Sequence, residues 1–211
     1  MRFSPSVRIK GLYAITPDEP DTDELVRKVR LALSGGARVV QYRNKTAEAE
    51  LRLEQARALM ALASEYSVPL IINDDAVLAQ RVDADGVHLG SEDGSIASAR
   101  MVLGGGKLIG VSCYNRLDLA REAVREGADY IAFGSFFASA VKPDAVSASL
   151  ELLRQARREF VVPIVAIGGI TAHNAKQLLD AGADALAVIS AVFGAADIRS
   201  IAQRLSALDY S

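Results

Sequence analysis

The chain contains one short pattern four times, and an internal repeat restricts the possible folds more than any other feature here. Each copy has a glycine or aspartate, an alanine and a charged residue directly before a short apolar run. The copies are Gly36-Ala37-Arg38, Asp83-Ala84-Asp85, Gly127-Ala128-Asp129 and Gly182-Ala183-Asp184. Further apolar runs lie between the copies at 68–73, 107–112 and 162–167, and one more, at 11–16, precedes the first copy. Together these runs predict eight short strands, apolar on both faces as buried parallel strands are.

Helical patterns separate the predicted strands. Apolar residues recur at helical spacing over 23–33, 47–66, 117–126, 149–160 and 172–181. Gly35, Gly127 and Gly182 stand where helices are expected to end. Eight strand–helix units of about 26 residues predict a single (β/α)₈ TIM barrel over residues 1–211. A doubly wound open sheet is the alternative, but the even spacing and the fourfold pattern favour a closed barrel.

Composition narrows the possible partners. The net charge is −2, so no strong field attracts a nucleic acid or an anionic membrane. Cys113 is the only cysteine, which excludes an internal disulfide, and no apolar stretch is long enough to span a bilayer. The first ten residues show no signal peptide. We therefore expect a soluble cytoplasmic protein that binds small molecules; a homo-oligomer stays open.

In a TIM barrel the active site lies at the carboxyl ends of the strands. After the second strand, Gln41, Arg43 and, if the strand persists, Lys45 share one face. An amide, a guanidinium and an ammonium together suit a polyanion. The alternative, which the strand end by itself supports equally well, is that Arg43 and Lys45 are two surface cations exposed to solvent.

Carboxylates follow the third and fourth strands. Asp74 and Asp93 would come from neighbouring strands, and Mg²⁺ typically binds one or two carboxylates together with substrate phosphates. The alternative is that Asp75 or Asp93 caps a helix. We favour the cap for Asp75 and the metal for Asp74.

The remaining strand ends supply further candidates. Ser112 is suited to bind a phosphate oxygen, whereas Cys113 is given no chemistry. The long connection after the sixth strand resembles a lid, and Lys142 is its cation or simply a surface lysine. Gly168-Gly169 and Ser190 end the last two strands, where barrels bind phosphate, although glycines also make tight turns. His88 and His173 are too few for a histidine metal site and receive little weight.

In order along the chain, the strand ends resemble those of the thiamine-phosphate synthase family, and the likeness covers almost the whole sequence. The matching segments are GLYAIT at 11–16, Gln41-x-Arg43-x-Lys45, IND at 72–74, GVHLG at 86–90, GVS at 110–112, DYIAFG at 129–134, AIGGI at 166–170 and VIS at 188–190. The resemblance implies a TIM-barrel transferase. It would couple 4-amino-5-hydroxymethyl-2-methylpyrimidine diphosphate to a thiazole phosphate, or its carboxylated form, with release of pyrophosphate.

The resemblance also assigns roles to residues. It implies that Asp74 and Asp93 bind Mg²⁺, and that Arg43, Lys45, Lys142 and Ser112 act on the diphosphate. The substrate-binding set that it implies is Gln41, Tyr42, Arg43, Asn44, Lys45, Asn73, Ser112, Ser139, Ala140, Val141, Lys142, Gly169, Ile189 and Ser190. The family is thought to react through a pyrimidine carbocation, with Gln41 and Asn73 orienting the ring.

One segment departs from the family pattern. Where relatives commonly have Thr-x-Thr-Lys, this chain has Ser139-Ala140-Val141-Lys142, and Val141 donates no hydrogen bond. We expect weaker or rearranged thiazole binding but retained activity. Two alternative functions remain. A thiazole tautomerase would lack many of the residues that bind the diphosphate and the metal. A non-catalytic barrel would bind thiamine precursors without converting them.

Overall fold

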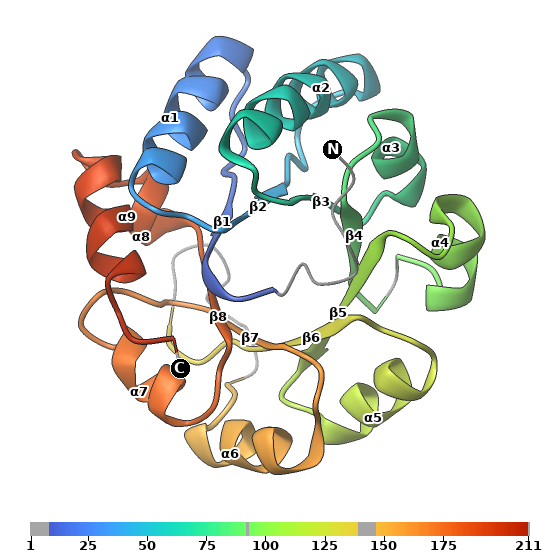
Figure 1. The fold of residues 1–211 in the computed structure, drawn as a ribbon, viewed down its shortest axis with the longest axis vertical. Coiled ribbons are helices and arrows are strands. Elements are labelled where there is room, and N and C mark those ends of the chain that lie inside the picture. The colour runs from blue at the N-terminus through green and yellow to red at the C-terminus, as the bar shows by residue number, and fades with distance from the viewer. Residues whose placement is uncertain (1–8, 92, 139–146, 211) are drawn as a thin grey trace.

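Eight parallel strands close into a barrel, each hydrogen-bonded to the next and the last to the first (Figure 1). This computed structural model describes residues 9–91, 93–138 and 147–210. The strands are β1 (Gly11–Ile15), β2 (Val39–Tyr42), β3 (Leu70–Asn73), β4 (Gly86–Leu89), β5 (Leu108–Tyr114), β6 (Tyr130–Phe133), β7 (Ile164–Ile167) and β8 (Ala185–Val188). The predicted closed barrel is confirmed.

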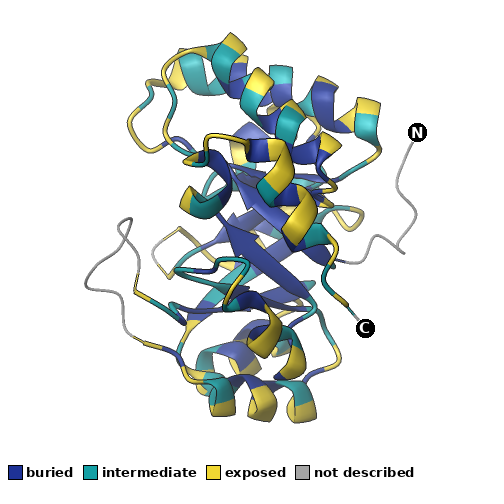
Figure 2. Cartoon of the chain, turned by 90° about the vertical axis from the view of Figure 1, so that its left-hand side faces the viewer, coloured by how far each residue is buried: buried dark blue, intermediate teal, exposed yellow. Residues whose placement is uncertain are grey.

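Helices surround the barrel on its outside (Figures 1 and 2). They are α1 (Thr22–Ser34), α2 (Ala49–Tyr66), α3 (Ala76–Arg81), α4 (Ile96–Leu103), α5 (Leu117–Arg125), α6 (Leu150–Glu159), α7 (Ala175–Asp180), α8 (Ser190–Phe193) and α9 (Ile198–Ser206). All five predicted helices are present, with shifted ends. In particular, α7 begins at Ala175, so His173 precedes the helix instead of lying in its first turn.

Alternating side chains give the molecule two cores. One lies between the strands and the helices and includes Leu12, Val40 and Ile72. The other fills the inside of the barrel and includes Tyr13 and Tyr130. Successive residues of one strand thus serve different cores, which explains why the strand sequences are apolar throughout.

The repeated aspartate has a structural role. In three of the four copies its carboxylate accepts a hydrogen bond from a backbone N–H at the start of the preceding strand, on its first or second residue. These bonds join Asp85 to Leu70 (2.8 Å), Asp129 to Ile109 (2.8 Å) and Asp184 to Ile164 (2.7 Å). The remaining copy, Gly36-Ala37-Arg38, has an arginine in place of the aspartate. Arg38 packs against Gly11, where a Cβ would lie 2.9 Å from Arg38 Cδ. The repeat therefore ties each strand start to its neighbour.

We expect Asp184→Ala to lower the free energy of unfolding by about 2–3 kcal/mol, because the Ile164 N–H loses its partner. Arg157, which pairs with the same carboxylate at 2.8 Å, loses its partner as well. Urea unfolding measures the change. In the matched control Asp180→Ala, an exposed ion pair with Lys176 is lost, which costs less than about 0.5 kcal/mol. Equal losses in the two variants would contradict this role.

Candidate active site

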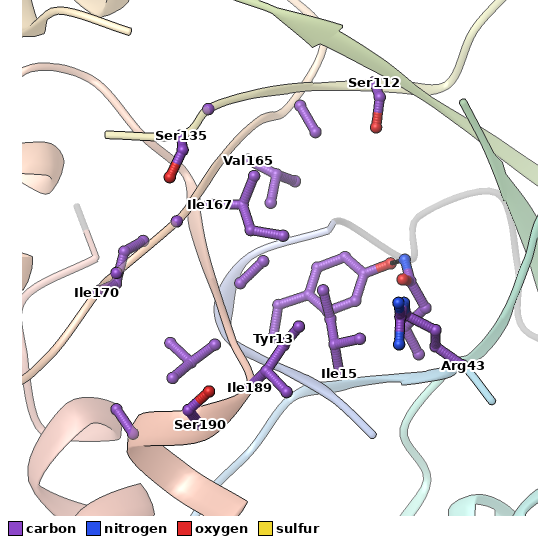
Figure 3. A pocket seen from close by; sticks show the side chains of 18 of the residues that line it. Tyr13, Ile15, Arg43, Ser112, Ser135, Val165, Ile167, Ile170, Ile189 and Ser190 are labelled. Atoms are coloured by element: carbon purple, nitrogen blue, oxygen red, sulfur yellow. Dashed lines mark hydrogen bonds between the residues drawn. The ribbon is translucent and has the colours of Figure 1, made fainter. Parts of the chain in front are cut away.

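A pocket of about 690 Å³ opens at the carboxyl ends of the strands, and all eight strands contribute to its lining (Figure 3). Strands β2 to β5 supply the polar side chains Gln41, Asn73, His88, Ser112 and Tyr114, and β1 adds the phenol of Tyr13. Strands β6, β7, β8 and β1 supply the apolar side chains Ala132, Val165, Ile167, Ala187 and Ile15. The pocket therefore has a polar half and an apolar half. Figure 3 shows Arg43 and Ser112 on one side and Ile170 and Ser190 on the other.

Arg43 lies just past the end of β2 and lines the pocket. Thr16 fixes its backbone from both sides, because the Thr16 hydroxyl accepts from Arg43 N (2.8 Å) and donates to Arg43 O (2.9 Å). The guanidinium Nη1 lies 3.1 Å from Asp18 Oδ1. The arginine is therefore held at the pocket wall.

Lys45 reaches the site by another route than the sequence predicts. Since β2 ends at Tyr42, Lys45 is no longer part of the strand. The same Asp18 oxygen that pairs with Arg43 accepts a 2.8 Å bond from Lys45 N. The ammonium Nζ lies 3.5 Å from Asp74 Oδ2. The loop thus brings a cation to the predicted metal carboxylate.

Tyr42 and Asn44, which the family resemblance includes among the substrate-binding residues, turn their side chains to the protein interior. Tyr42 is 2% exposed, and its hydroxyl donates to Gln55 Oε1 at 2.9 Å. Asn44 Nδ2 donates to the same Gln55 oxygen and to Glu19 O. Because β2 alternates, Tyr42 faces the helices when Gln41 faces the pocket. These two side chains support the loop and do not line the pocket.

The two candidate metal ligands lie side by side. The carboxyl groups of Asp74 and Asp93 are within hydrogen-bonding reach, and burial together with Asp93 raises the pKa of Asp74. Gly90 N donates to Asp93 Oδ2 at 2.9 Å, which orients the second carboxylate. Within the described ranges no third histidine, cysteine or acidic residue joins the pair. Two oxygen ligands beside open space fit Mg²⁺, which keeps its other positions for water and phosphate.

Asp75 caps α3, as the sequence favours. Its carboxylate accepts from Leu78 N at 2.8 Å and pairs with Arg52 at 2.7 Å. This neighbour of Asp74 therefore has a structural task.

The turn after β7 and the end of β8 meet on the far side of the pocket. Gly169, Ile189 and Ser190 all line it. Gly169 has a φ of +61°, and a Cβ there would lie 2.5 Å from Ala138 O. Only glycine allows this close approach of the turn to the segment after β6.

Sequence reasoning missed His88 and two tyrosines. His88 is 9% exposed, and its ring nitrogens contact Tyr130 Oη (3.0 Å) and Ser112 Oγ (2.9 Å). Burial lowers the pKa of His88 to about 4. Tyr13 contacts both Tyr130 and Gln41. The available signal was parity, because in β4 the inward side is that of Gly86 and His88.

The segment Ser139, Ala140, Val141 and Lys142 lies outside the described residues. The helices that the structure does describe include none that is both long and apolar enough to cross a membrane.

Comparisons with known proteins give one consistent result. The family described as "Thiamine monophosphate synthase" matches residues 12–192. A thiamine-phosphate synthase of Nitrosospira multiformis is 57% identical over 97% of this chain and 88% of its own length. A thiamine-phosphate synthase of Thiobacillus denitrificans is 53% identical over 94% of each chain. A thiamine phosphate pyrophosphorylase structure from Pyrococcus furiosus aligns with a TM-score of 0.85 and 40% identity, over 94% of this chain and 95% of the other.

Proposed function

Because this chain belongs to the thiamine monophosphate synthase family, we propose that the two halves of its pocket each bind one substrate. The enzyme is a transferase of thiamine biosynthesis that joins a pyrimidine diphosphate to a thiazole phosphate and releases pyrophosphate. The observation that carries the assignment is the contact of Lys45 with Asp74, beside Asp93, in a loop where Asp18 also holds Arg43. Cations and carboxylates at one rim suit a metal-bound diphosphate.

The diphosphate belongs in the polar half. Arg43 offers paired N–H donors and Lys45 a point charge, while Asn73 and Ser112 add neutral polar groups along the same wall. Gln41, on β2 two residues before Arg43, would orient the pyrimidine ring. Lys142 completes the proposed set from outside the described residues.

Asp74 and Asp93 would hold Mg²⁺. The donor set fits the ion because both ligands are carboxylate oxygens, and their mutual repulsion is relieved when a cation binds. When bound, the ion neutralises the negative charge that builds up on the departing diphosphate.

The reaction needs no general base in this pocket. The thiazole nitrogen attacks with its own lone pair, the new C–N bond forms at the pyrimidine methylene, and the C–O bond to the diphosphate breaks. Arg43 and Lys45 stabilise the electron pair that leaves with the diphosphate. The apolar wall of Ile15, Val165 and Ile167 keeps water away from the methylene carbon while it is electron-poor.

The thiazole phosphate belongs at the opposite end of the pocket. The backbone of Gly169 and Ile189 and the hydroxyl of Ser190 line that end. The remaining predicted contacts, Ser139, Ala140 and Val141, lie outside the described residues.

Both substrates mixed with the enzyme should give thiamine phosphate and pyrophosphate in equal amounts, and only when Mg²⁺ is present. Both products are measured in the same reaction, with and without a chelator. Full activity in the chelator would contradict the metal assignment. Thiazole binding without any pyrophosphate would contradict the transferase mechanism.

A further inference from the structure

Five polar side chains from five different strands form one hydrogen-bonded chain across the inside of the barrel. In order they are Gln41 (β2), Tyr13 (β1), Tyr130 (β6), His88 (β4) and Ser112 (β5), with successive distances of 2.8, 2.9, 3.0 and 2.9 Å. Both ends of this hydrogen-bonded chain, Gln41 and Ser112, line the pocket, and so do parts of Tyr13 and His88. The three middle residues are buried, and the proposed reaction gives none of them a role.

Gln41, at the amide end, sets the donor-to-acceptor direction of this hydrogen-bonded chain. Gln41 Nε2 donates to the Tyr13 hydroxyl, so the oxygen of Tyr13 accepts and its single hydrogen must go elsewhere. Among the described residues, Tyr130 is the other partner of Tyr13, so Tyr13 donates to it. Tyr130 in turn donates its own hydrogen to His88 Nδ1.

This direction determines the form of the histidine. A neutral imidazole that accepts at Nδ1 carries its hydrogen on Nε2, and that hydrogen points to Ser112 Oγ at 2.9 Å. Because Nδ1 accepts from the Tyr130 hydroxyl, the buried imidazole is neutral, and burial raises the pKa of both phenols, so they keep their hydrogens. The Ser112 oxygen therefore accepts from His88, and its own hydrogen is left for the pocket.

We propose that Tyr13, Tyr130 and His88 are positioning residues that make Ser112 a hydrogen-bond donor toward the diphosphate. The inference rests on the proposed binding of the diphosphate beside Ser112. A donor is the useful polarity there, because diphosphate oxygens only accept and gain negative charge as the bond breaks. A serine free to rotate would present its hydrogen or its lone pairs equally well.

A glycine leaves space inside the barrel for this hydrogen-bonded chain. Gly110 lies next to Tyr130 across the β5–β6 ladder, and a Cβ on Gly110 would lie 1.9 Å from Tyr130 Cζ. The tyrosine ring can therefore cross the interior only over a glycine. The phenol rings of Tyr13 and Tyr130 meet at a centroid distance of 6.3 Å, and the His88 ring stacks on Tyr130 at 5.5 Å.

A double-mutant cycle tests whether Tyr130 acts through Ser112. Tyr130→Phe keeps the ring and removes the hydroxyl, and we expect it to lower kcat about 5- to 10-fold, the effect of one hydrogen bond. In a Ser112→Ala background the same change should have almost no further effect. Independent, multiplicative losses would overturn the proposal. Tyr210→Phe is the matched control, because it removes a hydroxyl that bonds to Leu205 O far from the pocket.

Nitrogen-15 NMR of the enzyme without substrates detects the tautomer of His88, which reports the direction of these hydrogen bonds. The protein has 2 histidines, so a His173→Gln variant identifies which imidazole signals belong to His88. We expect the Nε2–H tautomer for His88, and loss of that preference in Tyr130→Phe. An Nδ1–H tautomer would overturn the proposal. If Ser112→Ala retains full turnover, the proposed catalytic role of Ser112 is wrong, and with it this inference, whatever the tautomer.

Discussion

Asp74→Asn is expected to lower turnover about 10³-fold at saturating substrate and to raise the Mg²⁺ concentration needed for half-maximal rate, because it removes one of the two proposed metal carboxylates. Asparagine is the clean replacement at this position. Asp74 has a φ of +65°, a conformation that asparagine adopts far more readily than most residues. Asp74→Ala should be equally inactive but adds backbone strain of about 1–2 kcal/mol. Steady-state rates over a Mg²⁺ titration measure the effect.

Stability separates this loss of activity from unfolding. Burial and Asp93 raise the pKa of Asp74 in the folded protein, so this group stabilises the fold below its unfolded pKa and loses that contribution as the pH rises through its folded pKa. At pH 7 without metal, the asparagine variant should therefore be at least as stable as the parent. Added Mg²⁺ should raise the Tm of the parent only.

Asp75→Asn is the matched control for Asp74. It alters the adjacent carboxylate, which caps α3 and pairs with Arg52, and asparagine is also a good cap. Turnover should change less than about twofold, because this side chain supports the helix. If Asp75→Asn lost as much activity as Asp74→Asn, the assignment of the metal to Asp74 would be wrong.

The barrel was predictable from sequence because its signal is local and repeated. A strand end is marked by the first polar residues after an apolar run, so Gln41, Asn73 and Ser112 were all found there. Closure of the barrel then brings them together without further information. The Asp74 and Asp93 pair follows from the same rule, since β3 and β4 are neighbours.

Features that depend on loop paths and on contacts across the barrel could not be predicted. Strand alternation predicts Lys45 beside Gln41 and Arg43 only if the strand persists; β2 ends at Tyr42, and the loop brings Lys45 to Asp74 instead. His88 is unremarkable as a single histidine. It becomes a candidate only when its bonds to Tyr130 and Ser112 are seen, and these partners lie on other strands.

A role of His88 also corresponds to no sequence motif. Two histidines are too few for a histidine metal site, and the spacing of the sequence assembles no Ser–His–Asp or Cys–His set. A buried neutral imidazole that passes a hydrogen-bond direction from one side chain to another leaves no spacing pattern. Such a role becomes visible only when donors and acceptors are counted in three dimensions.

Arg43→Ala is expected to lower kcat/KM for the pyrimidine diphosphate about 10²- to 10³-fold, the usual effect of removing one group that stabilises developing negative charge. Arg43→Lys should recover only part of this loss, because lysine keeps the charge but not the paired geometry. Thr16 holds the Arg43 backbone in both variants, so the loop should keep its shape.

Exposed Arg27 on α1, which pairs with Glu24, provides the matched control for charge alone. Arg27→Ala changes the net charge as Arg43→Ala does, so it should leave both kcat and KM within about twofold if position matters and total charge does not. The split between the constants then identifies the role of Arg43. A loss confined to KM would mean that Arg43 binds the diphosphate equally before and during bond breaking, whereas a fall in kcat means that it acts on the leaving group.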